Sequence, residues 1–334
     1  YGGLFAAELN RSGRNLSWNA EFEDITPEFR ARSGFIRRTG VAQAELGGSY
    51  NWYPESGLLQ RWGPRAEFSG LWDHDDLWSG RSMKEYRASG TLSTAFRGNM
   101  NLWLSGSWRN YNFDRAEYDG LVSGGVDGLG GTPYRPDQAQ FQNLFGASLN
   151  LSVSRWERIR GSVRAGWGQD VIFDRVTGTP VETANEYSAR INLNLFLTTG
   201  LRGEVGVRHE SLFRSSDGSR YSSATIPRVQ AQYQFSKALF VRSIVEYGAQ
   251  ESRGLENPET GEDLYYCSGE ECSLRGGRAS NDFNLQLLGA YEPSPGTVVY
   301  LGYSRFMIEE DSFRFDNLEA QNDGFFLKVS YLLR

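Results

Sequence analysis

Polar and apolar residues alternate along long stretches of the chain, most clearly over residues 186–197. The apolar positions there are Tyr187, Ala189, Ile191, Leu193, Leu195 and Leu197, and the polar ones are Glu186, Ser188, Arg190, Asn192 and Asn194. Because successive side chains of a β-strand point to opposite faces, this pattern predicts a strand with one apolar and one polar wall. Similar stretches begin near residues 145, 159, 201, 229, 241, 283 and 325.

The lengths of the stretches and of their connections favour a membrane barrel over a soluble β-sandwich, which also alternates. The stretches exceed the about 5 or 6 residues of a globular strand and suit the about 9 to 11 of a membrane-spanning strand. Short turns are expected near residues 13, 55, 98, 157, 199, 237 and 294, and long polar loops over 25–39, 73–82, 114–138, 170–184, 212–225, 251–280 and 310–323. We therefore predict an all-β, transmembrane, antiparallel up-and-down β-barrel of about 14 to 16 strands, with short periplasmic turns and long extracellular loops. Residues 1–334 are expected to be one such domain, in a bacterial outer membrane.

The strand count itself comes out odd. Strands are expected to start near residues 3, 15, 40, 59, 84, 100, 142, 158, 186, 201, 226, 239, 281, 297 and 324. Single-chain bacterial barrels use even numbers of strands. We therefore expect either that the count is wrong by one or that one or more strands precede Tyr1.

Composition narrows the function further. Aromatic residues make up 14% of the chain and there are 39 glycines, which is typical of a barrel with aromatic girdles and many turns. The formal net charge of −6 argues against nucleic acid as a partner, because phosphate binding needs clustered Lys and Arg. The chain begins at Tyr1 without a leader sequence, which indicates a processed secreted precursor or a piece of a longer protein.

Two cysteines, Cys267 and Cys272, lie close together in a polar segment. A local, even pair predicts a small disulfide in an oxidising compartment. No metal site is expected there, because two thiolates without a nearby histidine do not complete a tetrahedral shell.

The polar face carries the candidate functional residues. By alternation it includes Arg109, Arg160, Arg164, Arg190, Arg202, Glu204, Arg208, Arg228, Arg242 and Glu246, together with Glu186 and Glu210. Charges at membrane depth are costly unless they face water or a partner, so these residues predict a lumen. Two interpretations remain: a hydrated channel whose opposed charges select solutes, or a closed interior in which the charges pair. We favour the channel, because a sheet this wide leaves space that side chains alone cannot fill.

Other chemistry is sparse, and we expect neither an enzyme nor a cofactor. His74, in the acidic run 72–76, is interpreted as a solvated loop tip, and His209 as an interfacial residue. Acidic groups over 256–263 and 309–311 are interpreted as solvated loops rather than calcium ligands. The Gly-rich segment 120–133 is either an external mobile loop, the plainer interpretation, or an inward-folded constriction. If Trp103 and Tyr300 both face the lumen, a path for sugars to stack on is a further hypothesis.

Three segments carry a family resemblance: WNAEFEDITPEFR at 18–30, GFIRRTG at 34–40 and FLKVSYLLR at 326–334. They resemble a bacterial outer-membrane family whose members carry an N-terminal carbohydrate-binding-like domain ahead of a large C-terminal barrel. The resemblance implies an outer-membrane location and an upstream sugar-binding-like module, with no activity to carry over. Arg334 departs from the terminal aromatic residue of many proteobacterial barrels.

The functional hypothesis is a porin-like outer-membrane channel for passive passage of small polar solutes, with carbohydrates as one class. The alternative is a barrel that anchors or supports an N-terminal binding domain or a partner complex. Expected partners are outer-membrane lipid, lipopolysaccharide and the solutes, with partner subunits or the upstream carbohydrate-binding-like domain in the alternative.

Overall fold

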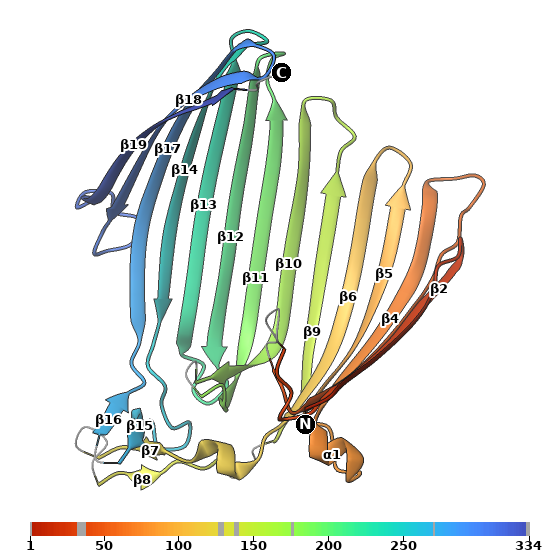
Figure 1. Cartoon of the computed structure of the whole chain (residues 1–334), viewed down its shortest axis with the longest axis vertical. Coiled ribbons are helices and arrows are strands. Elements are labelled where there is room, and N and C mark those ends of the chain that lie inside the picture. Colours follow the sequence, from red (N-terminus) through yellow and green to blue (C-terminus); the bar gives the residue numbers. More distant parts are fainter. Residues whose placement is uncertain are drawn as a thin grey trace.

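A single antiparallel sheet of fifteen strands dominates the computed structural model, which describes residues 2–31, 38–125, 130–136, 140–174, 177–269 and 271–331 (Figure 1). Its strands are β1 (Leu4–Arg11), β2 (Leu16–Ile25), β3 (Val41–Tyr50), β4 (Leu59–Asp73), β5 (Glu85–Phe96), β6 (Met100–Asn112), β9 (Gln140–Val153), β10 (Ile159–Phe173), β11 (Pro180–Phe196), β12 (Leu201–Arg214), β13 (Arg220–Gln234), β14 (Leu239–Ser252), β17 (Arg278–Ser294), β18 (Thr297–Ile308) and β19 (Glu319–Tyr331). Each strand pairs with the next one in this order. The prediction of an all-β, up-and-down antiparallel fold with 14 to 16 strands is confirmed.

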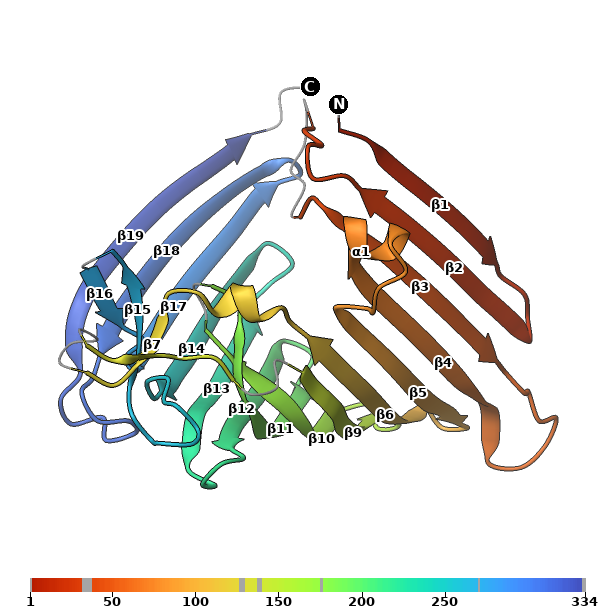
Figure 2. The ribbon, with the colours of Figure 1, turned by 90° about the horizontal axis from the view of Figure 1, so that it is seen from below.

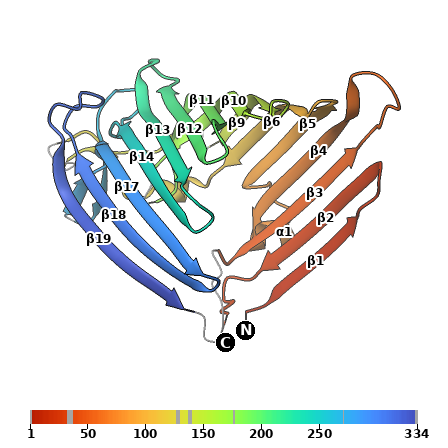
Figure 3. The same cartoon turned by 90° about the horizontal axis from the view of Figure 1, so that it is seen from above.

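The sheet is rolled into a wide arc, with β1 and β19 as its two edges (Figures 2 and 3). Within the described residues, no backbone pairing joins β1 to β19. Neighbouring strands alternate in direction, so the first and the fifteenth run the same way along the barrel axis. The rolled sheet therefore has one open seam between two edges of equal direction.

The pairing register keeps apolar and polar side chains on separate faces of the sheet. Residues that pair directly across neighbouring strands share a face. One apolar row crosses five strands through Leu102, Leu151, Val163, Ile191 and Val207. Val163, Ile191 and Val207 expose 41%, 43% and 38% of their surface, so this face is both apolar and uncovered.

Two of the expected long loops are shorter than predicted. Residues 170–184 and 212–225 were expected to be loops, but β10 runs to Phe173, β11 starts at Pro180, and only residues 215–219 separate β12 from β13. Polar residues at these strand ends interrupt the alternation although the backbone pairing continues. The additional residues of these strands contribute side chains to the core of a second, smaller structure at the end of the main sheet.

This second structure is a four-stranded sheet in the order β16 (Glu271–Leu274), β15 (Leu264–Ser268), β7 (Leu121–Ser123), β8 (Thr132–Pro133). Its strands come from two connections far apart in sequence, the one after β6 and the one after β14. We call the described parts of these connections, residues 113–125, 130–136, 253–269 and 271–277, the lid. The lid lies across the end of the main sheet where the long connections gather (Figures 1 and 2).

Two short helices complete the fold, α1 (His74–Trp78) and the 3-10 helix η1 (Arg115–Tyr118) in the lid. In the part of the chain that the structure describes, no helix has the length and apolar character needed to cross a membrane. Asp114 caps η1 by accepting a hydrogen bond from the Ala116 backbone N–H at 3.1 Å. In turn, the Glu117 carboxylate accepts a hydrogen bond from the Asp114 backbone N–H. This reciprocal capping fixes the first turn of the lid.

The lid has its own apolar core, shared with the ends of the sheet strands. Its buried members are Phe113, Tyr118, Leu121, Tyr134, Ile172, Val181, Ala184, Tyr221, Leu255 and Leu264. Leu121 and Leu264 lie on the paired strands β7 and β15 and are 1% and 0% exposed. Burial of these side chains joins the two connections to the sheet as one packed unit.

We predict that Leu264→Ala loosens the lid without unfolding the main sheet. Removing this fully buried side chain leaves a cavity and costs about 2–5 kcal/mol of lid stability. Hydrogen exchange of lid amides should accelerate while β10 to β12 stay protected.

The matched control is Leu274→Ala, in the same lid but 50% exposed. It should change exchange little, because an exposed apolar side chain loses little contact on truncation. Equal acceleration in both variants would show that the lid has no packed core.

Candidate functional site

All ten charged residues predicted to line the lumen lie on one face of the main sheet. By pairing register this face carries Arg109, Arg160, Arg164, Arg190, Arg202, Glu204, Arg208, Arg228, Arg242 and Glu246. Their role in selecting solutes stays a prediction. Trp103 and Tyr300 also share this face, which meets the condition for the sugar-stacking hypothesis.

This charged face is the concave one. The lid core packs on Tyr111, Ile172, Ala184 and Leu212, which belong to the same alternate-residue series as the arginines of β6, β10, β11 and β12. In Figure 2, which looks along the rolled sheet from the lid end, β7 and the yellow helical turn before it lie inside the outline of the arc. The face that the lid contacts is therefore the inside, and the apolar rows form the outside.

Some of the inner charges are paired. Arg109 reaches across β9 to Asp170 at 3.2 Å, Arg208 contacts Glu210 at 2.7 Å, and Arg228 contacts Glu246 at 3.1 Å. Within the described residues, neither Arg164 nor Arg190 makes an ion pair or a hydrogen bond. The face is thus neither fully paired nor fully free.

A hollow of about 560 Å³ opens on this face and extends across β4, β5, β6, β9, β10, β11 and β12. Its charged lining residues are Glu67, Arg87, Arg109, Arg164, Glu186, Arg190, Arg208 and Glu210. Its floor is made of small residues such as Gly146, Gly166 and Ser188, which leave room above the backbone. A neighbouring hollow of about 480 Å³ shares Arg87 and Arg109 and extends toward the lid.

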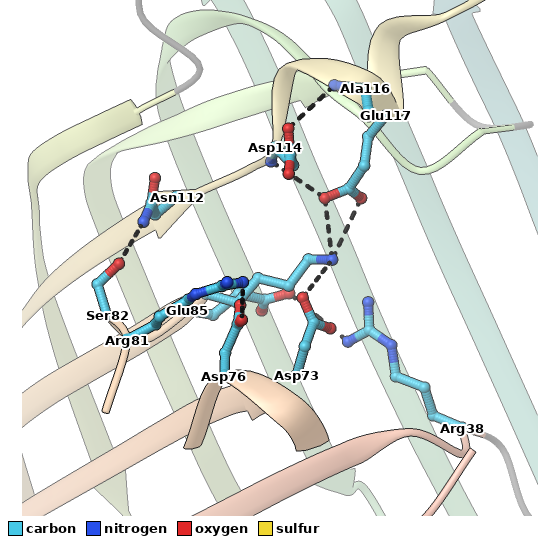
Figure 4. Close-up of polar contacts among 11 residues, drawn as sticks. Arg38, Asp73, Asp76, Arg81, Ser82, Glu85, Asn112, Asp114, Ala116 and Glu117 are labelled. Carbon is cyan, nitrogen blue, oxygen red and sulfur yellow. Dashed lines mark hydrogen bonds and ion pairs between the residues drawn. The ribbon is translucent and has the colours of Figure 1, made fainter. Parts of the chain in front are cut away.

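Lys84 connects the lid to the wall of the sheet. Its Nζ lies 3.0 Å from Glu117 Oε1 on η1 and 3.5 Å from Asp73 Oδ2 at the end of β4. Figure 4 labels Glu117 and Asp73, whose carboxylates point toward each other across this contact. The ammonium group also lies 5.3 Å from the centre of the Phe113 ring. This lysine is only 13% exposed, so the contact is partly shielded from solvent.

A second connection between the lid and the main sheet uses buried charges. Arg214, at the end of β12, is 1% exposed, pairs with Glu182 and donates to the Gly254 carbonyl at 2.6 Å. Arg275 of the lid lies 3.5 Å from Asp174. The Arg214–Glu182 pair joins β12 to β11 within the main sheet, whereas the Arg275–Asp174 pair and the contact of Arg214 with Glu256 at 3.5 Å join the sheet to the lid. Because removal of one partner from a buried pair leaves an uncompensated charge, these two contacts resist separation of lid and sheet.

Two tyrosines bind the lid to the start of β11. The Tyr118 hydroxyl donates to the Pro180 carbonyl at 2.7 Å, and the Tyr134 hydroxyl donates to the Val181 carbonyl at 2.8 Å. Burial raises the pKa of both phenols above their ordinary value, so they stay neutral donors.

The structure corrects the interpretation of His74 as a solvated loop tip. Its Nδ1 lies 2.6 Å from Asp24 Oδ1, and Trp78 Nε1 donates to Asp24 Oδ2 at 3.1 Å. Asp24 is 7% exposed, so the histidine helps to satisfy a buried carboxylate. His209 faces the outer side and contacts Thr225 Oγ1 at 2.8 Å.

The Gly-rich segment 120–133 is described except for residues 126–129. It contributes β7 and β8 to the lid sheet, so the interpretation of a mobile external loop is wrong for its described part. Its pairing partner, β15, lies more than a hundred residues away, and no local signal predicts that contact. A disulfide joins Cys267 and Cys272 across the β15–β16 hairpin.

Within the described ranges, no group of three or more His, Cys, Asp or Glu side chains is arranged to hold a metal ion. Residues 34–37 and 332–334, which fall in the segments that carry the family resemblance, lie outside the described residues.

Sequence reasoning missed Arg87, Asp170 and Lys84. Arg87 belongs to an alternating polar series with Ser89 and Thr91, but its apolar counterparts are mostly Ala and Gly, so the contrast between faces is weak. Asp170 and Lys84 lie in or next to segments predicted to be loops, where alternation does not predict which face of the sheet a side chain occupies.

No protein-family model matches the chain, and no curated protein sequence matches it. Among solved structures, it is similar to a Q482A mutant of the ferric enterobactin receptor PfeA from Pseudomonas aeruginosa in complex with enterobactin, at a TM-score of 0.47 and 12% identity, over 98% of this chain and 57% of that one. It is also similar to outer-membrane-expressed OmpT of Vibrio cholerae, at a TM-score of 0.34 and 8% identity, over 97% and 99%. A NanC porin structure aligns at a TM-score of 0.27 and 12% identity, over 75% and 94%. The chain spans little more than half the length of the receptor.

We predict that the two lid tyrosines ionise only when the lid opens. Because their folded pKa is raised above the unfolded value of about 10, the stability that they contribute is complete below about pH 10 and is lost as the pH rises through the folded pKa. Ultraviolet absorbance of tyrosinate should show a late phase that coincides with loss of lid protection.

The late phase should shrink in a variant that carries Tyr118→Phe and Tyr134→Phe. An unchanged late phase in that variant would mean that other tyrosines produce it.

Proposed function

We propose that the chain forms a passage for small polar solutes across a bacterial outer membrane, without covalent chemistry. The observation that carries the proposal is the separation of side chains by face. The ten charged residues predicted to line the lumen lie on the concave face, and the uncovered apolar rows lie on the convex one. An apolar convex face suits lipid. Charges on the concave face need water or partners, which a hydrated lumen supplies.

The incomplete pairing of the inner charges supports a hydrated interior. A closed structural core would pair its charges, because an unpaired charge away from water is very costly. Arg164 and Arg190 have no acidic partner within the described residues, and they border a hollow of about 560 Å³. Water in that hollow would solvate both guanidinium groups.

The lid supports control of entry at one mouth. It lies at the end with the long connections, which in outer-membrane barrels is the extracellular side. Its core and charged contacts hold it to the sheet, so we propose that solutes enter when contacts such as Lys84–Glu117 open.

A second candidate is a scaffold that holds a partner complex or an N-terminal binding domain. The outer edges of β1 and β19, which pair with no other strand in the part of the chain that the structure describes, favour it, because an unpaired strand edge is a template for pairing with another β-segment. The upstream carbohydrate-binding-like domain implied by the family resemblance stays a prediction.

We predict that Ile191→Arg destabilises the membrane-inserted protein by about 2–4 kcal/mol, because it places a charge on the lipid-facing side at mid-strand. The control is Asn194→Arg on the same strand, whose concave position faces Glu204 on one neighbouring strand and Arg160 on the other, so that attraction and repulsion offset each other. It should cost less than about 0.5 kcal/mol. Urea unfolding in lipid vesicles measures both, and a larger loss for Asn194→Arg would reverse the assignment of the faces.

The test of passage is planar-bilayer conductance of the full chain. We expect discrete conductance steps, with a higher open probability for Lys84→Met, which removes the contact between η1 and β4. Arg81→Met is the control, because Arg81 is close in sequence but pairs with Asp76 and does not contact the lid.

Silence from protein that is folded by heat-modifiable migration would overturn the channel and favour the scaffold. Equal effects of Lys84→Met and Arg81→Met would keep the channel and reject the lid as its gate.

A further inference from the structure

Three arginines stand side by side on the concave face of β10, β11 and β12. Arg190 pairs directly with Arg164 on one neighbour and with Arg208 on the other. Like charges in directly facing positions repel each other and destabilise a sheet. Arg208 forms an ion pair with Glu210 at 2.7 Å, whereas Arg164 and Arg190 form no ion pair within the described residues. The row therefore carries two positive charges that no carboxylate neutralises by an ion pair.

The hollow above this row has an excess of positive charge. Five arginines and three glutamates line it. Two of the glutamates are already engaged, Glu67 with Arg65 at 2.6 Å and Glu210 with Arg208. An anion placed between Arg164 and Arg190 would meet two guanidinium groups and no closer acid on the same register row.

The neighbouring row, one step toward the lid, offers hydroxyl groups. Thr91, Ser105 and Ser148 pair in sequence across β5, β6 and β9, and Gly166 connects this row to Ser188. Hydroxyls both donate and accept hydrogen bonds, so they suit a polyhydroxylated solute. Gly166 places no side chain between the hydroxyls and the arginines.

An aromatic side chain ends the arginine row. Trp103 on β6 pairs with Asn150, which pairs with Arg164. Two strand spacings separate Trp103 from Arg164, which is about 10 Å at the backbone. This is the size of one or two sugar rings, and an aromatic ring can pack against their apolar faces.

We propose that this part of the concave face binds small sugar acids, with the carboxylate on Arg190 and Arg164 and the hydroxyls on the serine and threonine row. A guanidinium group binds a carboxylate through two parallel hydrogen bonds, which gives the arginines their specificity over neutral sugars. The hollow of about 560 Å³ matches the size of small-molecule sites. The inference rests on the proposed function only in taking the concave face as accessible to water.

The test is calorimetric titration of the full chain, folded in detergent, with glucuronate, glucose and inorganic phosphate as probes. Glucuronate should bind, and glucose and phosphate should bind at least tenfold more weakly. Arg190→Gln should weaken glucuronate binding at least tenfold. Arg190→Lys should fall between the two, because it keeps the charge and loses the paired hydrogen bonds.

The matched control is Arg61→Gln. Arg61 on β4 lies on the same face near the short-turn end, does not line the hollow and makes no ion pair within the described part of the chain, so its loss should leave glucuronate binding unchanged. Heat-modifiable migration confirms that each variant is folded.

Three outcomes overturn the inference: no glucuronate binding by the unaltered chain, equal binding by Arg190→Gln, or equal affinity for phosphate, which would indicate a general anion site. Because binding is measured without transport, its result is separable from conductance. Binding by a protein that is silent in bilayers rejects the channel alone, and conductance without binding rejects the sugar-acid site alone.

Discussion

The pairing register of the main sheet is the constraint on which the other features depend. Side chains alternate with a period of two, so a slip of one residue in a single strand exchanges its faces. In β11 such a slip would put Ile191 between Arg164 and Arg208 and move Arg190 between Ala165 and His209. A charge on the apolar convex side and an apolar residue on the charged concave side both oppose that slip. The apolar rows and the charged hollow are therefore consequences of one register.

The lid depends on the same register beyond the charged zone. The alternate residues that carry Arg164 and Asp170 on β10 continue to Ile172, and those that carry Arg190 on β11 include Ala184. Both apolar residues are buried under the lid, so the inner face changes from charged and uncovered to apolar and packed along each strand. Buried charges at Arg214 and the tyrosine hydroxyls then orient the lid on this apolar base. The surface under the lid and the hollow beside it are thus parts of one continuous face.

The two edge strands add a requirement of their own. In hydrocarbon an unpaired backbone group costs several kcal/mol, so a membrane-inserted sheet needs partners along β1 and β19. Since these strands run the same way, direct contact between them would be parallel, unlike every other pairing in the main sheet. A further antiparallel β-segment would satisfy both edges, and the channel and scaffold proposals share this need.

The alternation in the sequence determined the strand type, the number of strands and which arginines share a face, because these follow from local backbone geometry. It also separated short turns from longer connections, since turns and strands differ in local composition. The lid, the pairing of Lys84 with Glu117 and the position of His74 against Asp24 were decided by tertiary structure alone. These contacts join segments from 33 to more than a hundred residues apart, and no periodic pattern records which distant segments meet. The ends of β10, β11 and β12 were predicted too short for the same reason. Their side chains pack in the lid core, and the other residues of that core come from distant parts of the chain.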